Sequence, residues 1–384
     1  MNGSYAVCMF HPPMNADAVR AFVTTVKRQV RGLLAQQAAN AILAKTRAKY
    51  GRRLTPKNYR DMVQLGSVSD VAAYLKSYTR FSSSLSGLQD AAVHRANLEK
   101  MLFASNIVEI KALCHFERSV GEHLFEYVVR SAEDDELIHF VRLLAAGRPE
   151  DYILDLSGTV NGFSRIDFMR LSKVRTFWEL VEALSRTRYG KIFRSFPASP
   201  TGVPDITMIE ATLDKELYRS TFEMFRQSFH GDTRKELESL LGVQGELLNL
   251  RRIYRSKKYY GTSPELLRAQ MIGASSHISH RNLERMLHAD SQQEIEDILK
   301  TTWYKKYLHQ YSIENVDYFA DCVLQDLCNH KIRMSTHPAV VMFCYIIHTI
   351  NETENITNII EGVRYGVGPE KISSMLIRFD REGG

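Results

Sequence analysis

Glu246 and Asn249 are the residues whose types and spacing most invite chemistry, within the segment Glu246-Leu-Leu-Asn249-Leu-Arg-Arg-Ile253. On a helical wheel of about 100° per residue, Glu246 falls inside an apolar stripe with Leu250 and Ile253, and Asn249 lies at its edge. A buried carboxylate must be paired or hydrogen-bonded, because a buried unpaired charge costs several kcal/mol. Such a glutamate is either a general acid or base with a raised pKa, or a structural group that joins two helices.

The same motif occurs three times, and this recurrence favours the structural interpretation. Glu352 and Asn355 form another copy, and Glu136 and His139 form a fainter one in which His139 replaces the asparagine. The glutamates stand 110 and 106 residues apart (246 − 136 and 352 − 246). An enzyme needs one site, whereas this device recurs with different neighbours. We predict that the six residues form polar locks, meaning buried polar contacts that fix the register of packed helices, one in each of three related domains.

The other face of the Glu246 segment carries basic residues, namely Arg251, Arg252 and Arg255, with Lys258 nearby. The two sister copies carry different residues there. Three related domains that bind one asymmetric partner should share a core motif and differ in their surface residues, as these copies do. We predict that these four side chains point outward as a partner-binding surface, although a solvated basic face is the alternative for any single arginine.

Composition and motifs exclude several function classes. The net charge of +6 over 384 residues is far below that of a dedicated nucleic-acid binder. Five cysteines without a CxxC pair indicate a reducing compartment and no zinc cage. Phosphate-binding, dinucleotide-binding, hydrolase and zinc-protease motifs are missing, so we expect no catalytic residue, cofactor or metal. The longest apolar run, 339–347, is about half of a membrane span, and we expect a cytosolic chain that meets a membrane only through a partner.

The elements that would position these residues are all helices, since alternating strand patterns are missing. A helical pattern runs from Ala16 to Lys49, and Thr55-Pro56 predicts the start of a helix. A second repeated marker begins at Leu75, Leu184 and Leu299, which are 109 and 115 residues apart (184 − 75 and 299 − 184). We therefore predict an all-α chain with an extension at 1–40 and repeat domains at 41–162, 163–282 and 283–384.

The repeated motif, together with two further segments, resembles the C-type subunit of the V/A-type ATPases, the relative of the d-type subunit of vacuolar ATPases. The opening Ala41-Ile-Leu-Ala-Lys-Thr-Arg47, followed by Leu54-Thr, looks like the start of that family. The segment from Asn351 to Gly366 looks like its C-terminal signature, and the resemblance extends from about Ala41 to Phe379. His139 and the first 40 residues depart from the family pattern.

The resemblance implies three helical domains in a pseudo-threefold array that forms a funnel-shaped socket. It further implies a non-catalytic rotor subunit that links the central axle to the membrane proteolipid ring during ATP-driven or ATP-producing proton or sodium transport. The implied partners are the D-type and F-type axle subunits and the ring, at the cytoplasmic face of the membrane, with no direct nucleotide binding and no nucleic acid. The residues alone leave two alternatives open, a helical-repeat scaffold or nucleic-acid-binding module that uses the basic face, and an enzyme that uses one of the glutamates.

Overall fold

The structure is a computed structural model that describes residues 24, 37–88, 93–116, 123–155, 160, 162–197, 202–273 and 276–377. Every secondary-structure element within these ranges is a helix, which confirms the all-α prediction. Residues 37–50 are helical, whereas most of the predicted extension at 1–40 lies outside the described residues. The predicted helix start at Thr55-Pro56 is confirmed, with the Thr55 side chain capping the helix.

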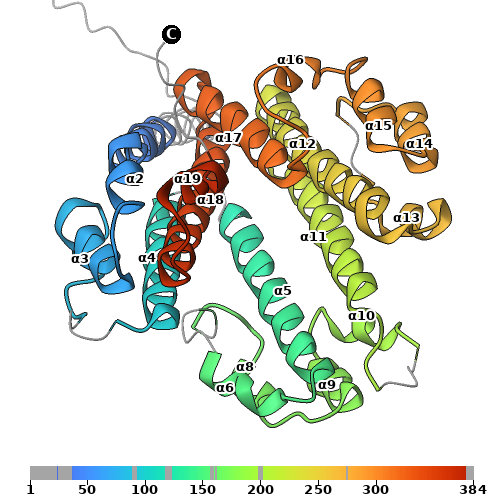
Figure 1. Ribbon diagram of the computed structural model, residues 1–384, viewed down its shortest axis with the longest axis horizontal. Coiled ribbons are helices and arrows are strands. Elements are labelled where there is room, and N and C mark those ends of the chain that lie inside the picture. The colour runs from blue at the N-terminus through green and yellow to red at the C-terminus, as the bar shows by residue number, and fades with distance from the viewer. Residues whose placement is uncertain are drawn as a thin grey trace, which may run out of the picture.

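Three antiparallel pairs of long helices form the framework. They are α4 (Arg95–Phe116) with α5 (His123–Ala145), α11 (Ile206–Ser228) with α12 (Gly231–Arg255), and α17 (Val316–Met334) with α18 (Pro338–Arg364). Helix α11 packs against both α5 and α12, α12 packs against α17 and α18, and α18 packs against α4. The three pairs therefore contact one another around the middle of the molecule (Figure 1).

Each long pair is followed by a short helix that begins with proline. These helices are η3 (Pro149–Asp151), which continues into α6 (Tyr152–Asp155), α13 (Pro264–Gln270) and α19 (Pro369–Met375). Proline suits the first turn because it lacks the N–H group that the turn leaves unbonded. Before α13, α12 passes into a π-helical turn, η4 (Ser256–Tyr260), that ends at Gly261 with a positive φ of 58°.

Three groups of short helices lie at the periphery, at the left, the bottom and the upper right of Figure 1. The 54–88 group holds α2 (Pro56–Met62) and α3 (Val68–Tyr78). The 164–197 group holds α8 (Phe168–Leu171), α9 (Phe177–Leu184) and α10 (Gly190–Arg194). The 276–311 group holds α14 (His280–His288), α15 (Gln292–Leu299) and α16 (Lys305–Leu308). One helix in each group is capped at its N-terminus by a Ser or Thr side chain. Ser67 caps α3, Thr176 caps α9 and Ser291 caps α15.

The apolar cores join segments that are distant in sequence. One core combines Leu54, Val71 and Leu98 with Ile356 and Ile372. The early and late parts of the described chain therefore pack against each other. A second core combines the end of α5 with the 164–197 group, and the largest joins the central long helices to the 276–311 group. The second core spans the boundary expected at 162, and the largest core spans those expected at 162 and 282. Both boundaries stay a prediction.

Candidate functional site

Glu246 lies on α12 with a side chain whose two oxygens are both hydrogen-bonded. Its Oε1 accepts from the backbone N–H groups of Ser276, His277 and Ile278 at 2.6, 2.7 and 2.7 Å. Its Oε2 accepts from the hydroxyl of Tyr304 at 2.8 Å. Burial and then the charge of Glu246 raise the pKa of Tyr304, so the phenol keeps the proton that it donates. We call this set of contacts the Glu246 network.

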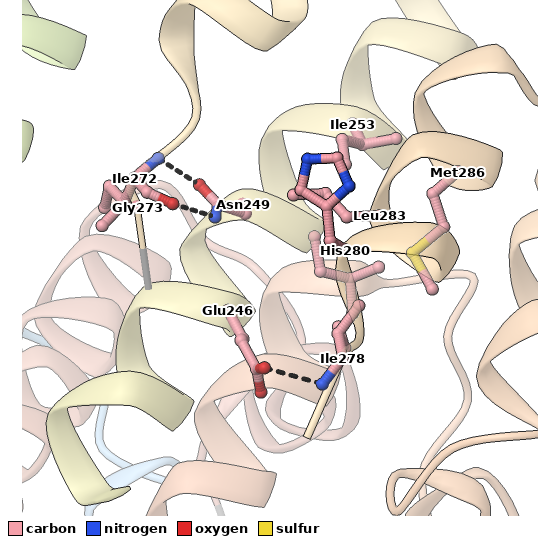
Figure 2. A pocket seen from close by; sticks show the side chains of 10 residues that line it. Glu246, Asn249, Ile253, Ile272, Gly273, Ile278, His280, Leu283 and Met286 are labelled. Atoms are coloured by element: carbon pink, nitrogen blue, oxygen red, sulfur yellow. Dashed lines mark hydrogen bonds between the residues drawn. The ribbon is translucent and has the colours of Figure 1, made fainter. Parts of the chain in front are cut away.

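Asn249, one turn further along α12, binds the backbone that follows α13. Its side-chain Nδ2 donates to the carbonyl of Ile272 at 2.9 Å, and its Oδ1 accepts from the N–H of the same residue at 2.8 Å. Figure 2 shows Asn249 in this contact, with Glu246 bound to Ile278 below it. Asn355 makes the same pair of bonds with Ile377 after α19, at 2.8 Å each.

Glu352 on α18 is bound by donors from the other end of the chain. Its Oε1 accepts from the backbone N–H of Leu54 at 2.6 Å, and its Oε2 accepts from Arg80 Nε and Nη2 at 2.9 and 2.6 Å. Burial by itself lowers the pKa of Arg80, but the charge of Glu352, together with Tyr345 and Glu109, outweighs it and raises that pKa. This Glu352 network therefore contains an ion pair in which both partners are buried.

The structure corrects the register of the first copy by one helical turn. Glu133, rather than Glu136, is the fully buried glutamate of α5, with an exposed fraction of 1%. Its Oε1 accepts from Ser164 Oγ at 2.6 Å, and its Oε2 accepts from the hydroxyl of Tyr189 at 3.1 Å. Arg188 lies 3.4 Å from the same Oε2 atom. These contacts form the Glu133 network.

Glu136 consequently occupies the place that Asn249 and Asn355 hold in the other copies. It accepts a hydrogen bond from the hydroxyl of Tyr152 at 3.0 Å, and Tyr152 belongs to the helix that follows the proline turn. His139 lies one turn further on, with its ring tilted against that of Tyr152 at a centroid distance of 6.1 Å. Glu136 and His139 both line a pocket of about 300 Å³ beside α4.

A repeated turn presents the donors to these glutamates. Thr79, Thr187 and Thr302 each bond through Oγ1 to a leucine carbonyl in the preceding turn, at 2.6, 2.7 and 2.7 Å. The next two residues are Arg80-Phe81, Arg188-Tyr189 and Trp303-Tyr304, which supply the guanidinium or phenol donors. Thr79 therefore corresponds to Thr187 and Thr302, although it follows its leucine by four residues and they follow theirs by three.

Each of the three networks joins one long helix to one short-helix group, and the third network returns to the first group of the chain. The Glu133 network joins α5 to the 164–197 group, and the Glu246 network joins α12 to the 276–311 group. The Glu352 network then joins α18 to the 54–88 group, 272 residues away in sequence at Arg80. Each of these three long helices is thus bound to a short-helix group, and the last contact returns to the start of the described chain.

The four basic residues of α12 and the turn after it have acceptors within the chain. Arg252 binds Asp214 on α11 and the carbonyl of Gln270 at 2.7 Å. Arg251 binds Asp321 on α17, and Arg255 Nη2 lies 2.7 Å from Asp317 on the same helix. The Lys258 ammonium donates to the carbonyl of Glu314 at 3.3 Å.

The prediction that this face points outward is wrong for Arg251 and Arg252, whose side chains are only 26% and 16% exposed. Helices α11 and α17 flank α12, so both sides of the helix are covered and its arginines contact carboxylates of its neighbours. Arg255 is more open, at 54%.

Glu246 does not offer an unbound carboxylate oxygen to the pocket beside its network. This pocket has a volume of about 240 Å³ and is lined mostly by aliphatic side chains such as Leu250, Leu283 and Met286 (Figure 2). Both carboxylate oxygens of Glu246 are already bound by donors of the chain. Among the described residues, no three His, Cys, Asp or Glu side chains are grouped to hold a metal ion.

Comparison with known proteins gives the family of the chain. The family model described as ATP synthase (C/AC39) subunit matches residues 42–375. The chain belongs to the ATP synthase C/AC39 subunit family. A curated relative from Methanosarcina mazei, the C-type subunit of the A-type ATP synthase, is 23% identical over 229 residues. That match covers 56% of this chain and 59% of the relative, so the chain spans well under two thirds of it.

The C/AC39 family assignment agrees with the resemblance drawn from the repeated motif, and it makes this chain a subunit of an ATP synthase complex. Such complexes are membrane-associated. Within the part of the C/AC39 chain that the structure describes, no helix is both long and apolar enough to cross a membrane.

The sequence patterns did not predict several residues of the three networks in this C/AC39 chain, above all Glu133, Arg80 and Leu54. Spacing to the next proline was the available signal for Glu133. Glu133 precedes Pro149 by 16 residues, close to the 18 and 17 residues that separate Glu246 and Glu352 from their prolines (149 − 133, 264 − 246 and 369 − 352). For Arg80 and Leu54 no local signal exists, because their partner lies at the far end of the chain.

Proposed function

We propose that this chain is a non-catalytic coupling subunit of a V/A-type ATPase, which links the central axle to the membrane proteolipid ring. The match to the C/AC39 family over residues 42–375 carries this proposal. Its partners are then the D-type and F-type axle subunits and the ring. As a part of the rotor it sits peripherally at the cytoplasmic face of the membrane, while ATP is made or hydrolysed elsewhere in the complex.

The interior of the molecule supports a mechanical role rather than a chemical one. Glu133, Glu246 and Glu352 are buried to 1–2% exposure, and each receives hydrogen bonds from a different short-helix group. A buried carboxylate whose two oxygens both accept hydrogen bonds from the chain is poorly placed to take up a substrate proton. The same contacts resist sliding of a long helix against its short-helix group, because sliding leaves a buried charge without donors.

We further propose that the three networks act as polar locks in three units around a pseudo-threefold axis, with a socket for the axle. The connections that the three networks make support this arrangement, since the glutamate of each unit is bound from an equivalent turn. Torque that passes through such a body is transmitted instead of being lost in helix movements. Glu136 and His139 then belong to the second contact of the first unit, in the place of Asn249 and Asn355.

The alternative of a scaffold or nucleic-acid-binding module relied on the basic face of α12. Arg251, Arg252 and Arg255 are paired with carboxylates of neighbouring helices, which leaves little of that charge for a phosphate backbone. An enzyme function is likewise disfavoured, because Glu246 and Glu352 are saturated with donors. The coupling function is the proposal that the contacts favour.

Affinity purification tests the proposal directly. The full chain carries a tag in its native host, and the complex is taken from detergent-solubilised membranes and identified by mass spectrometry. We expect the axle subunits and the proteolipid ring to co-purify with the chain, and a tagged soluble protein of similar charge from the same membranes serves as the control. Recovery of the chain without any rotary ATPase subunit would overturn the proposal.

A further inference from the structure

The 164–197 group is the most basic of the three short-helix groups. Residues 164–197 contain eight Lys and Arg against three Asp and Glu, a net charge of +5 in a chain whose total is +6. The equivalent 54–88 group has four against two, a net charge of +2, and the 276–311 group has five against five, which cancels. Among the three equivalent groups, the positive charge is therefore concentrated on one.

Most of this charge is unpaired. Six of the eight basic side chains are exposed and make no hydrogen bond or ion pair with any part of the chain that the structure describes. They are Arg165, Arg170, Lys173, Arg186, Lys191 and Arg194. In the 276–311 group, by comparison, Lys300 is paired with Glu296, and Glu284 is paired with Arg268 of α13. Two of the three acidic residues of the 164–197 group, Asp167 and Glu179, are bound to backbone N–H groups.

Large apolar side chains are exposed among these charges. Trp178 on α9 is 66% exposed, and Met169 on α8 is 48% exposed. The positions equivalent to Trp178, two residues after the cap, are Ser69 and Gln293 in the other groups. Helices α8, α9 and α10 lie together at the bottom edge of the molecule in Figure 1, at the ends of the long helices α5 and α11.

We propose that the 164–197 group binds an anionic phospholipid surface. Anionic lipid headgroups attract unpaired Lys and Arg, and tryptophan settles at the boundary between headgroups and acyl chains. The chain belongs to a membrane-associated complex, yet no described helix of it is able to cross a membrane, so such contact takes place at the membrane surface. This binding is distinct from the coupling function and does not require the axle or the ring.

Binding of the purified full chain to vesicles tests the proposal. We compare phosphatidylcholine vesicles with vesicles that also contain phosphatidylglycerol, at low and high salt, by co-sedimentation. We expect binding only to the anionic vesicles, and weakening as salt rises. Each Lys or Arg near an anionic surface strengthens binding about fivefold, so the triple variant Arg170→Gln, Lys173→Gln and Lys191→Gln should bind at least about tenfold more weakly.

A matched variant separates this surface from general charge. Arg281→Gln, Arg285→Gln and Lys305→Gln removes the same charge from three exposed residues of the 276–311 group and should retain binding within about twofold of the unchanged chain. The fluorescence of Trp178 should shift to the blue on vesicle binding, and the shift should vanish in Trp178→Phe, since Trp303 is stacked on His277.

Three results would overturn the proposal: equal binding to neutral and anionic vesicles or to neither, equal loss of binding in both triple variants, or complete competition by single-stranded RNA. The last result would assign the surface to nucleic acid. The triple variant of the 164–197 group should still co-purify with rotary ATPase subunits if the coupling function holds, so failure of one proposal is distinguishable from failure of the other.

Discussion

Glu352 and Glu246 occupy equivalent positions, but the chain stabilises the two carboxylates by different means. Glu352 faces the guanidinium of Arg80, a buried countercharge. Glu246 faces three backbone N–H groups and a tyrosine hydroxyl, which are neutral dipoles. Trp303 occupies the position in its turn that Arg80 occupies in the Glu352 network. Its ring stacks on that of His277, with 4.1 Å between the ring centroids.

The comparison shows that the carboxylate is the shared element, while its partner varies. An ion pair in the interior depends on both members, because removal of one leaves an uncompensated charge. A carboxylate held by several dipoles distributes its stabilisation over many donors, so the loss of one has a smaller effect. The two networks should consequently differ in their response to substitution and to pH.

Arg80→Met should have the largest effect, since it leaves Glu352 buried without its countercharge. We expect the free energy of unfolding in urea to fall by about 3–5 kcal/mol. Arg188→Met is the matched control in the Glu133 network, where the guanidinium is 34% exposed and lies at 3.4 Å, and it should cost less than about 1 kcal/mol. The double variant Arg80→Met with Glu352→Leu should recover part of the loss. Equal effects of the two single variants would remove the distinction between the networks.

Glu246→Gln should have an intermediate effect. The amide oxygen still accepts from the N–H groups of residues 276–278, but the hydrogen bonds lose their charge, and we expect a loss of about 1.5–3 kcal/mol in unfolding free energy. In the assembled complex, ion transport per ATP should fall while assembly persists. Glu136→Gln, in the less buried second contact of the first copy, is the control and should cost less than about 1 kcal/mol. Unchanged stability and coupling in Glu246→Gln would refute the role of this residue as a lock.

His277 should make the Glu246 network sensitive to acid. Burial lowers the pKa of His277 below its usual 6.5, against the opposing charge of Glu246. A group with a lowered pKa contributes stability above its unfolded pKa, and this contribution is lost as the pH falls through the folded pKa. Between pH 7 and pH 5 the unchanged chain should therefore lose stability relative to His277→Gln. Because the ring is partly exposed, the difference should stay below about 1 kcal/mol.

Thermal unfolding of both proteins across this pH range measures the difference. A pH slope that is the same with and without His277 would contradict the prediction.

Local patterns were sufficient for much of the fold. The helical spacing of apolar residues and the Thr55-Pro56 start signal both depend on neighbours within a few residues, and the structure has a helix beginning at Pro56. The first copy was misaligned because Glu133 and Glu136 lie one turn apart on the same helix, where the wheel separates them poorly. Spacing to Pro149 favours Glu133, and its hydrogen bonds from Ser164 and Tyr189 in the folded chain distinguish it from Glu136.

The sequence by itself determined that this chain is all-α, that a glutamate motif recurs along it and that it resembles the C/AC39 family. The first two properties follow from composition and periodicity, whereas the resemblance rests on the repeated motif and the segments 41–47 and 351–366. Tertiary structure alone decided that Arg80 is the partner of Glu352, that the arginines of α12 are paired, and that the unpaired charge lies on the 164–197 group instead. The physical reason is that pairing and exposure depend on which helices pack together, and that packing joins residues as far apart as Leu54 and Glu352.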